Sequence, residues 1–208
     1  MLYDISPPID AQLKVFPGDT PLSREVLLDM AKGDHITLST LRGTVHIGAH
    51  ADGPNHYGVD GRAIDEQPLD LYLGRCEVVH VDAERGSRIG REQLPPSIRA
   101  ERLLIATGTY PDPADFNLDF AALEPALVTA LHEEGVRLIG VDTPSVDTAD
   151  STDLPAHREF FRCDVAILEG LVLRDVPAGL YELIALPLPL VGFDASPVRA
   201  VLRELEGA

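Results

Sequence analysis

The stretch HIGAHADGPNHY, which begins at residue 46, concentrates side chains that can bind a metal ion. It contains His46, His50, Asp52 and His56, whereas the whole chain of 208 residues has only seven histidines. An even spread would place about 0.4 histidines in a window of this length. Neutral imidazoles and a carboxylate suit zinc or a related divalent ion, and a carboxylate can bridge two ions. The spacing therefore predicts a metal site.

The backbone of this stretch has to bend if its histidines are to share an ion. His46 and His50 would lie roughly 13 Å apart at Cα in an extended strand, but only about 5 to 6 Å apart across a helical turn or a tight bend. Gly48 and Gly53 permit unusual backbone angles, and Pro54 forbids continuing any helix. We therefore expect a bent segment.

Two further stretches carry side chains that could complete such a site. DSTDLPAHREFF contains His157 in a predicted polar loop, and DVAILEGL places Glu169 at the end of an apolar strand. A carboxylate is unusual at such a strand end unless a cation or hydrogen-bond donors satisfy it. Taken alone, a histidine or a glutamate in such a position is more often a solvated surface residue than a ligand. Both gain weight from the cluster upstream.

Apolar runs and helical spacing predict the elements that position these side chains. The expected strands are 75–81, 102–107, 137–141, 165–168 and 180–186, with alternating candidates at 24–30 and 35–41. A helix is expected over 119–134 and ends at Gly135; Pro125 interrupts it, so its continuous part can begin there. A closing helix is expected over 196–206, with Ser196 as N-cap and Pro197 at its first position. The predicted fold class is α/β, in a single domain.

Composition limits the compartment and the classes of partner. The 34 acidic and 17 basic residues give a formal net charge of −17, which repels nucleic acid and anionic membranes. No segment approaches the ~18 apolar residues of a membrane span, and the first residues lack a signal-peptide pattern. Cys76 and Cys163 are solitary and lie in apolar surroundings, which predicts buried free thiols and fits a reducing compartment. We expect a cytoplasmic protein with no nucleic-acid or membrane partner.

The histidine cluster resembles the signature His-x-Gly-(Thr/Ala)-His-x-Asp-x-Pro-x-His of the metal-dependent cyclase and hydrolase family. Within that family the chain is similar to the bacterial kynurenine formamidases (arylformamidases) over nearly its whole length. The supporting stretches, besides the one around His157, are VFPGDTP from residue 15, GVDTPSVD from 140, AILEGLVL from 166 and LPLPLVGFDASPVRAVLRE from 186.

The resemblance implies a fold, an assembly and a ligand set. The fold is a swivelling β/α/β-type arrangement around a mixed sheet, in one metal-dependent hydrolase domain over 1–208, usually assembled as a homodimer. The implied cofactor is two Zn²⁺ per chain, with Mn²⁺ or Co²⁺ as other candidates. The implied ligands are His46, His50, Asp52, His157 and Glu169. Both carboxylates in this set would touch both ions.

The resemblance also implies a reaction. N-formyl-L-kynurenine would be hydrolysed to L-kynurenine and formate, in tryptophan degradation by the kynurenine pathway. His56 would be the acid and base residue rather than a ligand, and it would protonate the departing nitrogen. Phe16, which stands where the family commonly has Trp, would form an aromatic wall for the substrate ring.

Other functions stay open from the sequence alone. Another member of this family could use the same ligands to open a cyclic amide such as isatin. A non-catalytic metal-binding or storage protein would need the ligands but would have no use for His56. A Ser or Cys hydrolase finds no support, because the sequence has no Gly-x-Ser-x-Gly elbow and neither cysteine lies in a polar setting.

Overall fold

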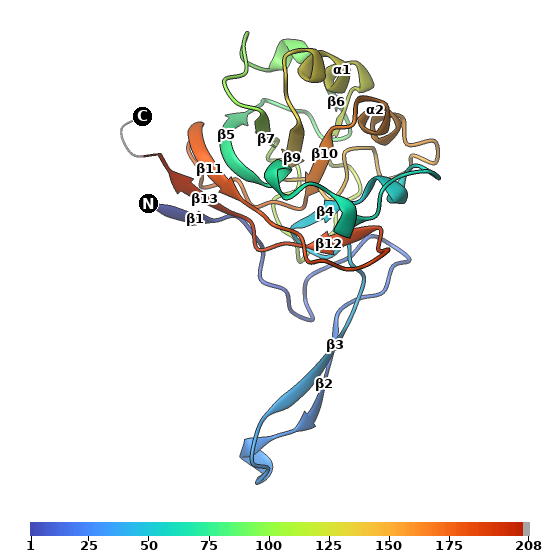
Figure 1. Ribbon diagram of the computed structural model, residues 1–208, viewed down its shortest axis with the longest axis vertical. Coiled ribbons are helices and arrows are strands. Elements are labelled where there is room, and N and C mark those ends of the chain that lie inside the picture. The colour runs from blue at the N-terminus through green and yellow to red at the C-terminus, as the bar shows by residue number, and fades with distance from the viewer. Residues whose placement is uncertain (206–208) are drawn as a thin grey trace.

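A large curled mixed sheet forms the centre of the protein (Figure 1). The computed structural model describes residues 1–205. The sheet has nine strands in the order β1-β13-β11-β5-β7-β9-β10-β4-β12. In that order their bounds are Leu2–Asp4, Val201–Glu204, Gly179–Ile184, Leu73–His80, Arg102–Ala106, Leu138–Val141, Ala166–Glu169, His50–Asp52 and Ala195–Pro197. The predicted α/β class with a mixed sheet core is confirmed.

The four central strands β5, β7, β9 and β10 run parallel to one another. The flanking pairs are antiparallel, including those that β4 makes with β10 and with β12. Every residue of β7 and β9 is buried. Parallel strands are covered on both faces, which explains why these segments are continuous apolar runs.

Side chains alternate along the central strands between two hydrophobic cores. On β7, Leu103 and Ile105 belong to one core, whereas Leu104 and Ala106 belong to the other. The helices α1 (Pro125–Glu133) and α2 (Pro155–Cys163) cover the first core (Figure 1). Each helix starts with a proline, whose fixed φ suits that position. The other core includes side chains of β4, β11 and β13.

A two-stranded ribbon projects away from this body (Figure 1). It consists of β2 (Ser23–Leu28) and β3 (Leu38–Arg42), which pair antiparallel, and we call residues 23–42 the arm. All residues of the two strands except Leu28 are exposed. The exposed apolar side chains of the arm are Val26, Leu27, Met30, Ile36, Leu38 and Leu41. A separate small sheet pairs β6 (Arg88–Ile89) with β8 (Ala122–Leu123).

The predicted strands correspond to β5, β7, β9, β10, β11, β2 and β3, with bounds shifted by a few residues, and are confirmed. The helix expected over 119–134 begins only at Pro125, because β8 occupies part of its first turns. Cys76 and Cys163 are buried and free, as predicted. Burial raises the pKa of the Cys76 thiol to about 12. Within residues 1–205 no helix combines the length and the apolar character that crossing a membrane requires.

The prediction of a closing helix over 196–206 is wrong. Its residues form β12 and β13, joined by a short connection, and Glu206 lies outside the described residues. The expected N-cap Ser196 instead accepts a hydrogen bond from the Leu188 main-chain nitrogen at 2.8 Å. β13 is inserted between β1 and β11, so its backbone is paired on both sides. These partners are distant in the sequence, and their pairing overrides the local helical spacing.

Candidate metal centre

The first histidine cluster is bent around β4, as predicted. Gly48 has φ 59°, in the left-handed region that favours glycine. Gly53 is needed for a different reason, since its φ of −84° is ordinary. A Cβ atom at Gly53 would lie 2.9 Å from the Ile64 main-chain nitrogen, which leaves no room for a side chain. Pro54 then starts a 3₁₀ turn that ends at His56.

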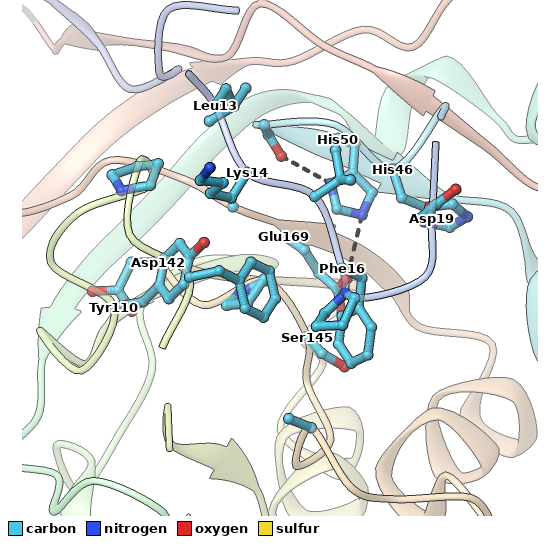
Figure 2. A pocket seen from close by; sticks show the side chains of 18 of the residues that line it. Leu13, Lys14, Phe16, Asp19, His46, His50, Tyr110, Asp142, Ser145 and Glu169 are labelled. Atoms are coloured by element: carbon cyan, nitrogen blue, oxygen red, sulfur yellow. Dashed lines mark hydrogen bonds and ion pairs between the residues drawn. The ribbon is translucent and has the colours of Figure 1, made fainter. Parts of the chain in front are cut away.

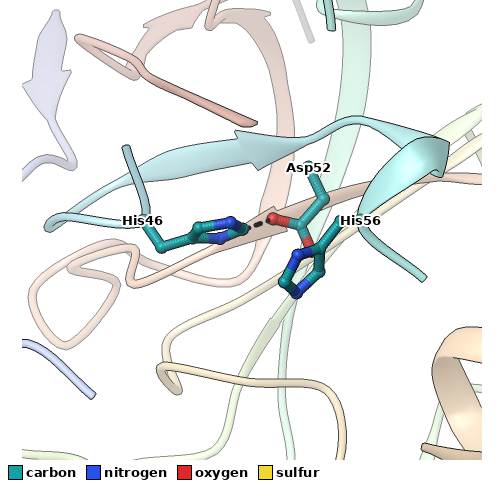
Figure 3. Close-up of side chains that lie close together, drawn as sticks. All are labelled: His46, Asp52 and His56. Carbon is teal, nitrogen blue, oxygen red and sulfur yellow. Dashed lines mark ion pairs between the residues drawn. The ribbon is translucent and has the colours of Figure 1, made fainter. Parts of the chain in front are cut away.

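Asp52 lies between the predicted histidine ligands. Its Oδ1 is 3.2 Å from His46 Nδ1 and 3.6 Å from His50 Nε2. Its Oδ2 is 3.7 Å from His157 Nε2. Figure 3 shows the ring of His46 directed at this carboxylate, with His56 beside it. One carboxylate therefore faces histidines on two sides.

Glu169 repeats this arrangement from the end of β10. Its Oε2 is 3.3 Å from His50 Nε2, and its Oε1 is 3.7 Å from His157 Nε2. The Val146 main-chain nitrogen donates a hydrogen bond of 2.8 Å to Oε1. Glu169 is opposite His50 in the antiparallel pairing of β10 with β4, so the sheet register brings the two together. The structure thus gathers all five predicted ligands in one place.

The donor set fits a divalent cation. Within the described chain His50 Nε2 and both carboxylate oxygens of Asp52 are buried without a hydrogen-bond partner. A buried carboxylate is costly unless a cation or several donors compensate it. Two groups of side chains have ligand atoms within 4.8 Å of one another, and Asp52 belongs to both. The groups are His46, Asp52 and His56, and His50, Asp52 and Glu169.

Each predicted histidine ligand is oriented by a hydrogen bond from the ring nitrogen that does not face Asp52. His50 Nδ1 donates to the Gly48 carbonyl at 2.9 Å, which leaves Nε2 free to face the carboxylates. His157 Nδ1 donates to Asp147 at 2.9 Å, and His46 Nε2 donates to Asp194 at 3.0 Å. Such partners fix the tautomer and the ring orientation of a metal ligand.

Sequence reasoning gave these two aspartates no role. The available signal was their place in GVDTPSVD and in the closing stretch, both of which carried the family resemblance.

The polar loop predicted around His157 is wrong, because His157 is a buried residue in the first turn of α2. Asp147 accepts hydrogen bonds from the main-chain nitrogens of Ala156 at 3.1 Å and His157 at 3.0 Å. It therefore caps the helix and orients the His157 ring with the same carboxylate. Leu154, just before the helix, has φ 46°, a conformation that costs about 1 to 3 kcal/mol in a non-glycine residue. The capping residue lies nine residues before Ala156, outside the adjacent positions where an N-cap is sought, so local patterns did not reveal this helix.

The charges of the site shift the pKa values of its histidines in two directions. Burial lowers the pKa of His46, but the carboxylates of Asp52, Asp194 and Glu169 together outweigh burial and raise it to about 9. Burial is likewise outweighed at His157, where Asp147 and Asp52 raise the pKa to about 10. A metal ion must displace these protons in order to bind. His56 differs, because burial lowers its pKa and keeps its ring neutral near pH 7.

A cavity of about 440 Å³ opens beside these side chains (Figure 2). Phe16 lines it and lies 36% exposed, at the position where a wall residue was expected. Its ring makes an edge contact with Phe116, at a centroid distance of 5.5 Å. Tyr110 contacts Phe116 in the same manner at 5.4 Å. The cavity therefore has an aromatic wall next to the clustered ligands.

His56 lines this cavity beside the ligand cluster. Its side chain is 34% exposed, and its ring centroid is 4.3 Å from that of His46. Its Nδ1 is 3.7 Å from Asp194 Oδ2. This position suits a proton carrier, but it also lies within reach of an ion bound by His46 and Asp52. The role assigned to His56 stays a prediction.

The sequence and the fold match known proteins. The family model for cyclases matches residues 3–148. The chain belongs to the cyclase family. A solved structure described as a potential metal-dependent hydrolase with cyclase activity is 26% identical, with 99% of both chains covered and a TM-score of 0.85. A predicted metal-dependent hydrolase from Bacillus stearothermophilus is 28% identical, with 97% of both chains covered and a TM-score of 0.80.

The fold also occurs in isatin hydrolase A from Labrenzia aggregata. That protein is 21% identical over 97% of this chain and 93% of its own, with a TM-score of 0.81. The family match therefore places this chain among the cyclases, and structures described as metal-dependent hydrolases share its fold.

Asp52→Asn is expected to remove metal from the protein, because the amide has no negative charge and only one oxygen that can bind an ion. Zinc should raise the melting temperature of the metal-free parent, since binding to the folded state stabilises it, and this rise should be lost in the variant. Elemental analysis and thermal unfolding with and without zinc measure both effects.

The matched control is Glu77→Gln. Glu77 is a buried carboxylate on β5 that pairs with Arg99 at 2.7 Å and does not line the cavity. The control should lose stability while keeping the parent metal content. An Asp52 variant with the full parent metal content would show that this residue is not a ligand.

Proposed function

We propose that this protein hydrolyses N-formyl-L-kynurenine to L-kynurenine and formate, in tryptophan degradation. The observation that most supports this is the pair of buried carboxylates Asp52 and Glu169, each directed at histidines on two sides, beside an aromatic cavity. Turnover of N-formylkynurenine by the metal-loaded protein, with a metal assay on the same preparation, tests the proposal.

The same geometry supports two zinc ions per chain. Asp52 presents Oδ1 to His46 and His50, and Oδ2 to His157. Glu169 divides its oxygens between His50 and His157 in the same way. Carboxylates that present one oxygen to each side are suited to bridge two ions. Mn²⁺ or Co²⁺ suits the same donors, so metal availability also decides which ion is bound.

The chain's own residues can bind the substrate and move its protons. Divalent ions held by this ligand set would supply a nucleophilic water at neutral pH and polarise the formyl oxygen. His56, neutral near pH 7, would take a proton from the attacking water and deliver it to the departing aryl nitrogen. Phe16 and Phe116 would hold the aryl ring and so orient the small formyl group.

Opening of a cyclic amide such as isatin is the second candidate reaction. Isatin hydrolases from two organisms share this fold, at 21% and 19% identity. Both substrates should be offered to one metal-loaded preparation under the same conditions. Turnover of isatin without turnover of N-formylkynurenine would replace the proposed function by this one.

We also propose that the protein is a homodimer and that the arm binds the second copy. An isolated two-stranded ribbon is marginally stable in water, and this one exposes six large apolar side chains. Residues 23–42 carry three arginines or lysines and three acidic residues, whereas the whole chain has a net charge of −17. Contact through this neutral segment avoids the repulsion between two strongly acidic bodies.

Leu41→Asp is expected to convert the dimer into a monomer, because a carboxylate replaces a side chain that is 74% exposed on the arm. Val59→Asp is the matched control, since Val59 is also exposed but lies outside the arm. Analytical ultracentrifugation at micromolar concentration gives the masses. A parent that sediments as a monomer, or a control that dissociates equally, would contradict the proposed interface.

Phe16→Ala is expected to raise KM for N-formylkynurenine by roughly 2- to 10-fold, in line with the worth of an aromatic pair. The loss should shrink for a formamide without a large ring. Phe161→Ala serves as control, because Phe161 is similarly exposed (41%) but does not line the cavity. Steady-state kinetics on both substrates decide the matter, and equal losses on the two would assign Phe16 to the fold instead.

His56→Asn is expected to lower the rate by roughly 10²- to 10⁴-fold, the usual contribution of a positioned acid or base. In the parent, kcat/KM should fall as the pH drops below the lowered pKa of His56, because the protonated ring cannot act as a base. The variant should lack this limb and keep the parent metal content. Loss of one ion in step with the activity would make His56 a ligand.

A further inference from the structure

The cavity wall carries a single strongly basic side chain. The whole sequence has two lysines, Lys14 and Lys32. Lys14 is the one lysine or arginine among the described residues that line the cavity. It stands next to the buried Leu13 and two residues before Phe16, so it belongs to the same wall as the aromatic side chain.

The ammonium group of Lys14 has no hydrogen bond or ion pair within residues 1–205. Lys32, by contrast, lies 3.7 Å from an Asp29 carboxylate oxygen. A chain with 34 acidic residues offers many partners for a cation. A lysine left free beside a cavity is therefore available to an anionic ligand.

The backbone holds Lys14 at the cavity. Its main-chain nitrogen donates a hydrogen bond of 3.0 Å to the Pro113 carbonyl, and Pro113 also lines the cavity. The preceding nitrogen, of Leu13, donates to Asp10 at 3.2 Å. In Figure 2, Lys14 lies on the side of the cavity where Tyr110 and Asp142 are found, across the view from His46. Lys14, Phe16 and the histidines His46 and His50 line the same cavity, so one ligand in it can contact all of them.

Asp142, an acidic side chain that lies on the same side of that view, already accepts several hydrogen bonds. Its carboxylate accepts hydrogen bonds from the Thr107 nitrogen at 3.0 Å, the Gly108 nitrogen at 2.9 Å and the Thr107 hydroxyl at 2.7 Å. These bonds fix the loop after β7, which leads to Tyr110. Asp142 forms no ion pair with Lys14 within 4.0 Å, so the lysine charge is not neutralised from this side.

We propose that Lys14 binds a carboxylate at the end of the substrate remote from the scissile amide, and that the cavity thereby selects anionic aryl amides over neutral ones. The inference rests on the proposed function, since the scissile amide is taken to lie at the clustered ligands. In N-formylkynurenine this carboxylate belongs to the amino-acid group, at the end of the molecule remote from the formylated nitrogen. An ammonium–carboxylate contact is a charge-assisted hydrogen bond and is stronger than one between neutral groups.

The test compares an anionic and a neutral formamide on the metal-loaded protein. Lys14→Met should raise KM for N-formylkynurenine and so lower kcat/KM about 10-fold. The kcat/KM for formanilide, which has no carboxylate, should stay at the parent value. Lys14→Arg should restore most of the loss. Lys32→Met is the matched control and should behave like the parent. The preference of the parent for the anionic substrate should weaken in 1 M salt, where a charge contact is screened.

A binding measurement keeps this inference separate from the proposed reaction. Calorimetry with kynurenine and with its methyl ester needs no turnover, and the parent should bind the free carboxylate about 10-fold more tightly than the Lys14→Met variant does. If the parent binds kynurenine more tightly than the Lys14→Met variant does, but does not hydrolyse N-formylkynurenine, the proposed function fails and the role of Lys14 stands. The Lys14→Met variant could instead lose kcat/KM or affinity equally for the charged and the neutral compound of a pair, or for neither. Either result would overturn the role of Lys14.

Discussion

The buried charge of Asp52 is the constraint on which the rest of the site depends. Its side chain is fully buried, and within the described chain neither oxygen accepts a hydrogen bond from a donor. Such a group is tolerated only where positive charge surrounds it, from protonated histidines or from a metal ion. His46 and His157 acquire raised pKa values for the same reason. Metal binding would replace their protons with a charge that satisfies both oxygens at once.

The sheet supplies the precision that such a cluster needs. β4 pairs antiparallel with β10, and this pairing sets His50 opposite Glu169. A slip by one residue would turn His50 and Asp52 to the opposite face, because side chains alternate along a strand. The loop after β9 carries Asp147, whose carboxylate both caps α2 and holds His157. Strand register and helix capping thus fix two halves of one site through different interactions.

Local patterns predicted what depends on neighbouring residues and missed what depends on remote ones. The central strands were recognisable because burial on both faces makes them continuous apolar runs, and Pro125 marked where α1 begins. The ligand residues were recognisable from their spacing and from the family resemblance. Local spacing predicts a helix over the strands at 195–197 and 201–204, but their pairing with β4, β1 and β11 determines their conformation. The roles of Asp147 and Asp194 depend on contacts across the fold, which spacing alone does not contain.

The clustered ligands do not decide between the two candidate reactions, because the same ions could activate water toward a formamide or a cyclic amide. Selectivity must come from the cavity wall, and much of that wall is the exposed segment that includes Lys14 and Phe16. This segment lies just before the arm. Of the predicted ligands, His50, Asp52 and Glu169 lie on buried strands and His157 on the first turn of α2, and only His46 lies in the bend that precedes β4. A change in the wall can therefore alter which substrate fits without disturbing the core, while a change in the ligands disturbs metal binding and folding together. The predicted ligands and the exposed wall segment therefore lie on different parts of the fold, so the wall can vary while the ligands stay in place.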